Sequence, residues 1–531
     1  MLEKEINYQA SRGRSAVREL LGMKSIFLTI MAAPLLLGQQ PCADLAKFQM
    51  PGMSITITKA EQVPAAAAGT VRVNPAAPVM VPVALPSYCR VDGVIDQRTG
   101  VGGKSYGIGF AVTLPDNWNS RFLFQGGGGL NGSVQMPLGA GAAGNNPGLA
   151  RGYAVVTTDT GHQGAVFDGS FFADQQASLD FYYVAIGRVA ALAKQIIARH
   201  YGRAPAHSYF VGCSTGGREA MIMSQRYPTY FDGIVSGDPA MRTGHSNLGL
   251  AYMEATYNAA APKDADGKPL PAQLFSDGDR KLIVGALLKT CDEKDGLTDG
   301  MIFSAKACDF DPAILSCAGA KTDSCLTPRQ VAGLKKAFAG PKGIYPGFPY
   351  DAGIDDQSFI PGLLRGVRIP VAPPSLRTEY DAEKAAADLA ADANSRLGDA
   401  TATKLSTFSG HGGKLLFYHG LSDPWFSPLD TLSYYEKMSR ENGGAEKVQS
   451  WSRLYLVPGM GHCQGGSATL DNFDMLSAVT DWVEKGTAPD EVIATGKDFP
   501  GRSRPLCAYP KHAQYSGQGD PNDAKNFSCR E

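Results

Sequence analysis

A G-x-S-x-G segment occupies residues 212–216 (GCSTG), directly after a strand-like stretch at 208–211 and before a helix-like stretch at 217–227. Such a turn is tight, so small residues must flank the serine, whose Oγ then lies at the N-terminus of the following helix. A strand that runs straight into a helix is typical of a parallel α/β sheet. The segment therefore predicts an α/β fold and marks Ser214 as a candidate nucleophile; the alternative is an ordinary glycine-rich turn.

The rest of the chain alternates between strand-like and helix-like segments, except for a long central stretch. Apolar residues recur at helical spacing over residues 179–201. Strand-like runs lie at residues 106–114, 121–125, 153–158, 233–236, 414–419 and 453–457. This alternation predicts βαβ units and a mostly parallel sheet. We therefore expect an α/β-hydrolase fold with a large lid domain inserted between core strands.

The central stretch contains four cysteines, an acidic loop and a proline-rich segment. We expect it to lie over the carboxyl edge of the sheet, where ligands bind in open α/β sheets. With 531 residues the chain exceeds one ordinary domain of about 100–200 residues. The predicted parts are an N-terminal extension with a signal peptide at 1–40, a first catalytic part at 41–239, the lid at 240–410 and a second catalytic part at 411–531.

The N-terminus carries a candidate targeting signal. Met23-Lys24 precedes an apolar run at 26–37 and a polar exit, the pattern of a secretory signal peptide. The run is shorter than the about 20 residues that span a membrane. We expect translation to start at Met23, and a secreted or periplasmic mature protein without a membrane span. A signal-anchor that stays attached is the alternative.

Charge and cysteine usage narrow the class of protein. The formal net charge is -1, so no basic surface for nucleic acid is predicted. The ten cysteines are an even number, which favours disulfides in an exported chain, and none forms a C-x-x-C pair typical of zinc sites. We expect a small-molecule substrate as the partner, and the sequence gives no indication of the oligomeric state.

A serine nucleophile needs a base and an orienting acid, in the chain order Ser, Asp, His for this fold. His462 follows the strand at 453–457, and Asp423 follows the strand at 414–419. Both therefore leave the carboxyl ends of strands, as Ser214 does. We predict His462 as base and Asp423 as acid. The rival acids lie further from a strand end and are Asp430, Asp471 and Asp474.

Other residues after strands are candidates for supporting roles. Four glycines at 126–129 follow a strand and resemble an oxyanion loop, so we assign oxyanion N–H groups to Thr215 and Gly128. A phosphate loop is excluded because no Gly-Lys-Ser/Thr ends the run. His419 and His162 also follow strands and are either structural or pocket-lining. We keep His419 as a candidate substrate contact.

Cys213 directly precedes the candidate nucleophile, and Cys463 directly follows the candidate base. Ser214 and His462 must lie within hydrogen-bond reach of each other. The two cysteines must then also lie close together, and in an oxidising compartment we expect them to form a disulfide.

These residues together resemble the tannase and feruloyl esterase family, which includes the enzyme that hydrolyses mono(2-hydroxyethyl) terephthalate. The resemblance rests on residues 212–218 (GCSTGGR), on residues 418–420 (YHG) with Asp423, and on residues 458–463 (PGMGHC). It covers nearly everything after the signal peptide. It implies a secreted serine ester hydrolase that cleaves esters of aromatic acids, with a hydrolase domain and a lid.

The resemblance also implies a structural calcium ion in the lid and four further disulfides. Asp292, Asp295 and Asp299 would supply carboxylates, and Leu297 and Met301 backbone carbonyls, which together suit Ca²⁺. Without the resemblance, an acidic run is more often a solvated loop. The implied bridges are Cys42–Cys89, Cys291–Cys308, Cys317–Cys325 and Cys507–Cys529.

The substrate is predicted only as a class. Trp425 and Phe426 follow the acid closely, so a flat acyl group could stack against them; the alternative is that both pack under the lid. A hydrolase for the terephthalate half-ester would hold the free carboxylate with a lid arginine. The sequence does not select one among Arg365, Arg368, Arg377 and Arg396. A non-catalytic binding protein on the same fold is the rival from another class.

Overall fold

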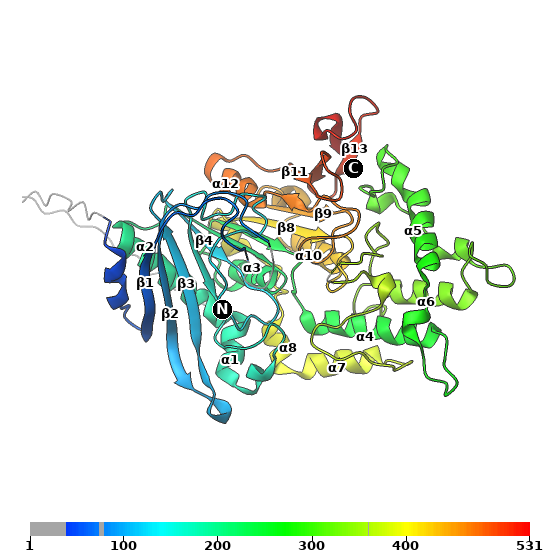
Figure 1. Ribbon diagram of the computed structural model, residues 1–531, viewed down its shortest axis with the longest axis horizontal. Coiled ribbons are helices and arrows are strands. Elements are labelled where there is room, and N and C mark those ends of the chain that lie inside the picture. The colour runs from blue at the N-terminus through cyan, green and yellow to red at the C-terminus, as the bar shows by residue number, and fades with distance from the viewer. Residues whose placement is uncertain (1–38, 74–78, 359) are drawn as a thin grey trace, which may run out of the picture. The chain divides into compact units, whose positions relative to one another are not determined.

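The computed structural model describes residues 39–73, 79–358 and 360–531. The predicted signal peptide, within residues 1–40, lies almost wholly outside the described residues. The described chain is built on one large twisted sheet flanked by helices (Figure 1).

The main sheet has nine strands in the order β1-β2-β3-β5-β4-β6-β7-β8-β9. In this order, β1, β2, β3 and β5 pair antiparallel with one another. The strands β5, β4, β6, β7, β8 and β9 pair parallel. The strands are β1 (Ile55–Val63), β2 (Tyr88–Thr99), β3 (Ser105–Pro115), β4 (Arg121–Gln125), β5 (Ala154–Thr158), β6 (His207–Cys213), β7 (Gly233–Gly237), β8 (Lys414–Gly420) and β9 (Ser452–Val457). The parallel part confirms the predicted α/β-hydrolase fold, whereas β1 and β2 were not predicted.

Helices cover both faces of this sheet. The helices between or after the core strands are α1 (Gln175–Leu179), α2 (Ala185–Tyr201), α3 (Thr215–Arg226), α10 (Pro428–Glu441), α11 (Ala445–Val448) and α12 (Met475–Lys485). Residues of α2, α3 and α10 share one core with Phe122 and Phe124 of β4, while α12 packs with Leu123 on the opposite face. Successive strand residues point to opposite faces, so β4 is apolar throughout because both of its faces are buried.

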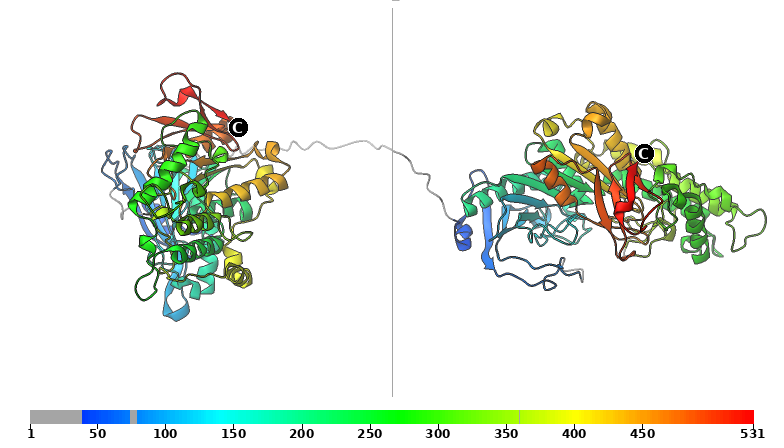
Figure 2. Two further views of the ribbon diagram at one scale, coloured as in Figure 1. Left: turned by 90° about the vertical axis from the view of Figure 1, so that its right-hand side faces the viewer. Right: turned by 90° about the horizontal axis from the view of Figure 1, so that it is seen from above.

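A long inserted segment, residues 238–413, connects β7 to β8. Its helices are α4 (Thr243–Ala260), α5 (Asp277–Cys291), α6 (Pro328–Ala339), α7 (Ala382–Ala391), α8 (Ala393–Gly398) and α9 (Ser406–Gly410). Leu250 and Met253 of α4, Leu287 of α5 and Leu334 of α6 form much of its own core. Figures 1 and 2 show the segment in green and yellow beside the β8 side, away from the blue β1 and β2. We propose that it is the lid; the domain boundaries stay a prediction.

The C-terminal residues form two small antiparallel sheets. Their strands are β10 (Asn472–Phe473), β11 (Glu491–Thr495), β12 (Ser503–Cys507), β13 (His512–Tyr515) and β14 (Phe527–Arg530). In the described chain, one helical stretch, Gln175–Tyr201, is long and apolar enough to cross a membrane, and it is mostly buried inside the molecule.

All ten cysteines are paired, in the five pairs that the sequence led us to expect. The bridges are Cys42–Cys89, Cys213–Cys463, Cys291–Cys308, Cys317–Cys325 and Cys507–Cys529. Four of them link cysteines that are consecutive among the cysteines of the chain. Cys213–Cys463 instead joins the end of β6 to the loop after β9, across 250 residues of sequence.

Candidate active site

Ser214 lies in a sharp turn between β6 and α3. Its φ of 64° and ψ of -123° are rare for a residue with a side chain, and its N–H donates to Gly237 O at 3.0 Å. A Cβ on Gly212 would lie 2.4 Å from Gly216 O, and one on Gly216 would lie 2.6 Å from Gly127 O. The two glycines are therefore required by close backbone packing, as the G-x-S-x-G pattern predicts.

The glycine loop at 126–129 is fastened to the first turns of α3. Gly216 N–H donates to Gly127 O at 3.1 Å, and the Thr215 hydroxyl donates to Gly129 O. The fully buried Glu219 accepts from Gly127 N–H at 3.0 Å. Thr215 is the first residue of α3, so its N–H has no intrahelical acceptor. Its N–H can therefore serve a ligand beside Ser214. The cavity there is lined by Gly129 and not by Gly128, so the role of the Gly128 N–H stays a prediction.

His462 and Asp423 form a buried pair at the carboxyl ends of β9 and β8. His462 Nδ1 lies 2.7 Å from Asp423 Oδ2, and Asp423 Oδ1 accepts from the N–H groups of Trp425 at 2.8 Å and Phe426 at 3.1 Å. Burial acts to raise the pKa of Asp423, but the neighbouring His462 and His419 outweigh it and hold that pKa below the ordinary range. Asp423 is therefore held as a carboxylate.

The far side of the His462 ring is free to react. Nε2 is buried and has no hydrogen-bond partner within the described chain, so the expected hydrogen bond between Ser214 and His462 is not formed in this structure. Burial lowers the pKa of His462, but the charge and hydrogen bond of Asp423 more than offset this, so the net pKa is raised. Cys463 and Cys213 are disulfide-bonded with Cα atoms 5.9 Å apart. Ser214 directly follows one cysteine of this bridge, and His462 directly precedes the other, so the bridge ties the two residues together.

The rival acids are occupied elsewhere. Asp430 pairs with Arg242 at the start of α4. Asp474 caps α12 by accepting from Ser477 N–H at 2.9 Å, and Asp471 accepts from Gly465 N–H at 2.7 Å. None of the three contacts His462, so Asp423 fits the role of acid best.

His419 does not lie where a substrate contact would be. It is fully buried and is not among the residues that line the cavity at Ser214. Its Nδ1 lies 2.8 Å from Thr431 Oγ1 and its Nε2 3.0 Å from Phe426 O. The expectation that His419 touches the substrate is therefore wrong, because both ring nitrogens are used inside the core. His162 is likewise buried, stacked on Phe171 at 3.7 Å.

A cavity of about 380 Å³ opens beside Ser214 and Thr215. Trp425 and Phe426 line it, with ring centroids 5.0 Å and 5.3 Å from that of His462. Both also belong to the core of the inserted segment, as the packing alternative expects, and stacking with an acyl group stays a prediction. The other aromatic side chains of the wall are Phe167, Phe172, Phe181 and Tyr182.

Two charged side chains line the cavity, Arg218 and Asp399. Arg218 is buried and donates to Tyr182 O at 3.0 Å and Phe181 O at 3.2 Å. The Asp399 carboxylate makes no hydrogen bond or ion pair with the described residues, and burial raises its pKa to about 6. The lining residues do not include the four arginines of the inserted segment considered above, which are Arg365, Arg368, Arg377 and Arg396.

The family model for tannase and feruloyl esterase matches residues 89–358 and 368–530 of this chain. The chain belongs to the tannase and feruloyl esterase family.

Individual members of the family are similar over most of their length. Mono(2-hydroxyethyl) terephthalate hydrolase of Piscinibacter sakaiensis is 38% identical over 518 residues, which cover 84% of this chain and 85% of the relative. Feruloyl esterase B of Aspergillus niger is 29% identical over 445 residues, covering 78% of this chain and 82% of the relative. The crystal structure of feruloyl esterase B from Aspergillus oryzae superposes with a TM-score of 0.73 at 25% identity, covering 92% of this chain and 99% of that chain.

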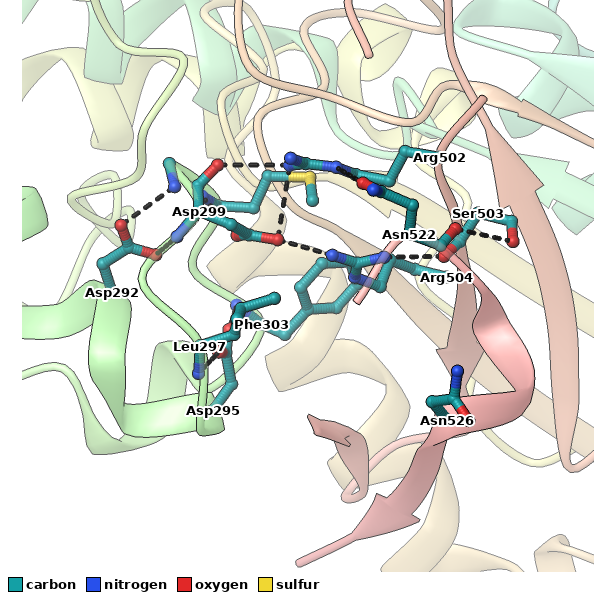
Figure 3. Close-up of polar contacts among 12 residues, drawn as sticks. Asp292, Asp295, Leu297, Asp299, Phe303, Arg502, Ser503, Arg504, Asn522 and Asn526 are labelled. Atoms are coloured by element: carbon teal, nitrogen blue, oxygen red, sulfur yellow. Dashed lines mark hydrogen bonds and ion pairs between the residues drawn. The ribbon is translucent and has the colours of Figure 1, made fainter. Parts of the chain in front are cut away.

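In this member of the tannase and feruloyl esterase family, the acidic loop follows α5. Asp292 and Asp295 lie in a 3-10 helix (Asp292–Asp295) and are buried. Asp292 accepts from Gly300 N–H at 2.9 Å, and Asp295 accepts from Phe303 N–H at 3.0 Å. Asp299 instead faces the C-terminal strands, where Arg504 donates to it at 2.6 Å and Arg502 at 3.3 Å (Figure 3).

The loop residues fit a hard cation in type and charge. Asp299 faces two arginines, whereas Asp292 and Asp295 are buried and accept only backbone N–H groups within the described chain, which leaves excess negative charge in the loop. Burial first, and then the charges of Asp299 and Asp292, raise the pKa of Asp295 to about 7. In the described chain, two groups of three ligand atoms lie within 4.8 Å of one another, and neither includes these aspartates. The residue types, rather than their present positions, therefore favour a cation.

Sequence reasoning missed several residues of these sites. Glu219 lies one turn after the serine, and its contact with the glycine loop depends on the fold of residues 126–131. Arg502 and Arg504 lie more than 200 residues from the loop that they contact. For the arginines no local pattern signals the contact; for Glu219 the only signal is an acidic residue on the buried face of a helix.

Proposed function

We propose that this chain hydrolyses esters of aromatic carboxylic acids through a serine-bound acyl intermediate. One observation carries the proposal: the Asp423–His462 pair, joined at 2.7 Å, presents an unpartnered Nε2 and is tied by Cys213–Cys463 to the residue beside Ser214. A binding protein on this fold has no use for that arrangement. Membership in a family of esterases supports the same conclusion.

The proposed reaction has two halves. Ser214 Oγ attacks the ester carbonyl carbon while His462 Nε2 takes its proton. The N–H groups of Thr215 and Gly128 stabilise the oxyanion of the tetrahedral intermediate. His462 then returns the proton to the alcohol oxygen, the ester C–O bond breaks and the acyl group stays on Ser214. Water attacks this acyl-enzyme in the same manner, releasing the acid and restoring Ser214.

Asp423 supports both halves without touching the substrate. We place the proton of His462 on Nδ1, where Asp423 can accept it, so that the unpartnered Nε2 is left to take the proton of Ser214. Its charge also stabilises the imidazolium that forms in each half. Because Asp423 accepts from two further N–H groups, it keeps its orientation while His462 gains and loses a proton.

The cavity supports an uncharged aromatic acyl group. Trp425, Phe426 and the phenylalanines of the wall offer flat apolar contact. Arg218 is committed to two carbonyl groups, and Asp399 would repel a second carboxylate. We therefore place hydroxycinnamate- or gallate-type esters ahead of the terephthalate half-ester. The names of the similar enzymes, which include feruloyl esterases and the terephthalate half-ester hydrolase, span both classes.

Calcium binding and export are part of the proposal. Asp292, Asp295 and Asp299, with the carbonyls of Leu297 and Met301, would hold a structural Ca²⁺ that neutralises the excess charge of the loop. Five disulfides support an oxidising destination, outside the cell or in the periplasm.

Replacing Ser214 with alanine tests the reaction. Hydrolysis of a p-nitrophenyl ester should fall to the background rate, while Ser133→Ala, at an exposed serine, should retain full activity. Substantial turnover by Ser214→Ala would refute the serine mechanism. A rate panel of methyl ferulate, methyl gallate, mono(2-hydroxyethyl) terephthalate and a short aliphatic ester then tests the acyl class. A clear preference for the aliphatic ester would refute the aromatic cavity.

A further inference from the structure

A second buried carboxylate, Asp238, lies behind the candidate triad. It follows β7 directly, is fully buried and has a φ of 36°, which residues with side chains rarely adopt. Its N–H donates to Tyr418 O at 2.9 Å, and its Oδ1 accepts from Gly420 N–H at 2.9 Å. Both partners belong to β8, so the carboxylate is fixed at the strand end that also carries Asp423.

Asp238 faces the groups that surround the candidate base. Its Oδ1 lies 3.6 Å from His419 Nε2, and its Oδ2 lies 3.5 Å from Cys213 Sγ of the bridge. One of its oxygens also lies within 4.8 Å of ligand atoms of both Asp423 and His462. The titratable groups that face Asp238 in the described chain are therefore His419, Asp423 and His462, from β8 and from the loops after β8 and β9.

The two carboxylates of this cluster are not equally stabilised. Asp423 accepts N–H groups from Trp425 and Phe426 and also pairs with His462. Asp238 accepts one backbone N–H, and its distance of 3.6 Å to His419 is longer than the 2.7 Å between Asp423 and His462. Two buried carboxylates this close resist being charged together. Burial, only partly offset by His419, raises the pKa of Asp238 to about 7, whereas the pKa of Asp423 stays low.

We propose that Asp238 is a positioning residue that acts through His462 and sets the pH range in which His462 works as a base. The inference rests on the proposed function of Ser214 and His462. When Asp238 is ionised, its field stabilises the imidazolium of His462; when Asp238 is protonated, that support is lost. The proton exchanges with solvent, and Asp238 forms no bond to the substrate.

The variant Asp238→Asn tests this with little change in shape. Asparagine removes the charge and keeps an oxygen for the Gly420 N–H. The acid limb of the kcat/KM profile should move to lower pH by about one unit, because His462 loses a neighbouring negative charge. KM should stay unchanged. An unchanged pH profile in a folded variant would overturn the proposal.

Asp159→Asn is the matched control. Asp159 is also buried, and burial also raises its pKa to about 7, but it accepts from Gly109 and Gly161 N–H and faces neither His419 nor His462. The same exchange of carboxylate for amide should therefore leave the acid limb in place. An equal shift in this control would show that the effect on Asp238→Asn is not specific, and would overturn the proposal.

An NMR titration separates this inference from the proposed function and needs no folded Asp238 variant. In a Ser214→Ala protein, the ring ¹⁵N shifts of His462 should report two ionisations, its own and that of Asp238. A single-step titration would overturn the role of Asp238, whatever the activity of Ser214→Ala. Loss of the second step in Asp238→Asn would complete the assignment.

Discussion

Arg504 donates to Asp299 Oδ2 at 2.6 Å, although 205 residues separate them along the chain. The guanidinium is almost fully buried and lies over the ring of Phe527, 4.0 Å from its centroid. A buried ion pair that loses one partner leaves an uncompensated charge. The acidic loop of the inserted segment therefore depends on the C-terminal strand β12 for its stability.

Replacing Arg504 with methionine should destabilise the fold by about 3–5 kcal/mol, because Asp299 is left buried with one partner fewer. Urea unfolding of purified protein measures this. Arg502→Met is the comparison, since Arg502 is more exposed and pairs with Asp299 at the longer distance of 3.3 Å. It should cost clearly less. Equal losses for the two variants would contradict the ranking.

Calcium should stabilise the protein more at neutral than at acidic pH. The raised pKa of Asp295, about 7, means that the folded protein without metal binds more protons than the unfolded chain between about pH 4 and 7. Stability without metal should thus fall as pH rises through that window, and calcium, which displaces the proton, should remove the loss. The measurement is Tm with calcium and with EDTA at pH 5 and 7.5. Equal Tm values under all four conditions would argue against the site.

The Cys213–Cys463 bridge should support catalysis as well as stability. Replacing both cysteines with alanine should cost at most about 5.5 kcal/mol, the value that the simple chain model gives for a 250-residue loop. It should also lower kcat by about 100-fold, since a displacement of about 1 Å is enough for that loss. Removing Cys317–Cys325 is the control and should leave kcat unchanged. Wild-type kcat in a Cys213→Ala, Cys463→Ala protein that circular dichroism shows to be folded would leave the bridge a purely stabilising role.

Asp423→Asn should keep the fold and lose most of the rate. The amide cannot hold His462 in the required tautomer or stabilise its charged form, so kcat should fall by about 10⁴-fold. In the wild-type enzyme the raised pKa of His462 has its own consequence: kcat/KM should fall as pH drops through a value above the usual about 6.5. A pH profile of initial rates checks both statements. An acid limb below pH 6 would contradict the second.

The parts of the fold with strong local signals could be predicted from the sequence. β4 and the turn at Ser214 depend on short apolar runs and on glycines that the local backbone requires, so their positions follow from neighbouring residues. β1 and β2 were missed because antiparallel strands with one polar face have a weaker hydrophobic pattern than the apolar parallel strands.

The remaining errors concern contacts between distant segments. His419 lies inside β8, whereas Asp423 follows that strand, and the alternation of side chains along β8 and the contact with Thr431 turn His419 into the core. Asp238 resembles any acidic residue at a strand end until β8 and the loop after β9 are placed beside it. Direction and burial of a side chain, rather than its position after a strand, decide its role.

The pairing of the cysteines also bears on how the protein is made. The chain is synthesised from its N-terminus, and the partner of Cys213 lies 250 residues further on. The four cysteines of the inserted segment are therefore synthesised before that partner. A host that oxidises thiols quickly but cannot reshuffle them would trap Cys213 with one of those four. We expect the yield of soluble enzyme to depend on a disulfide isomerase during production, and a redox-buffered refolding mixture to substitute for it.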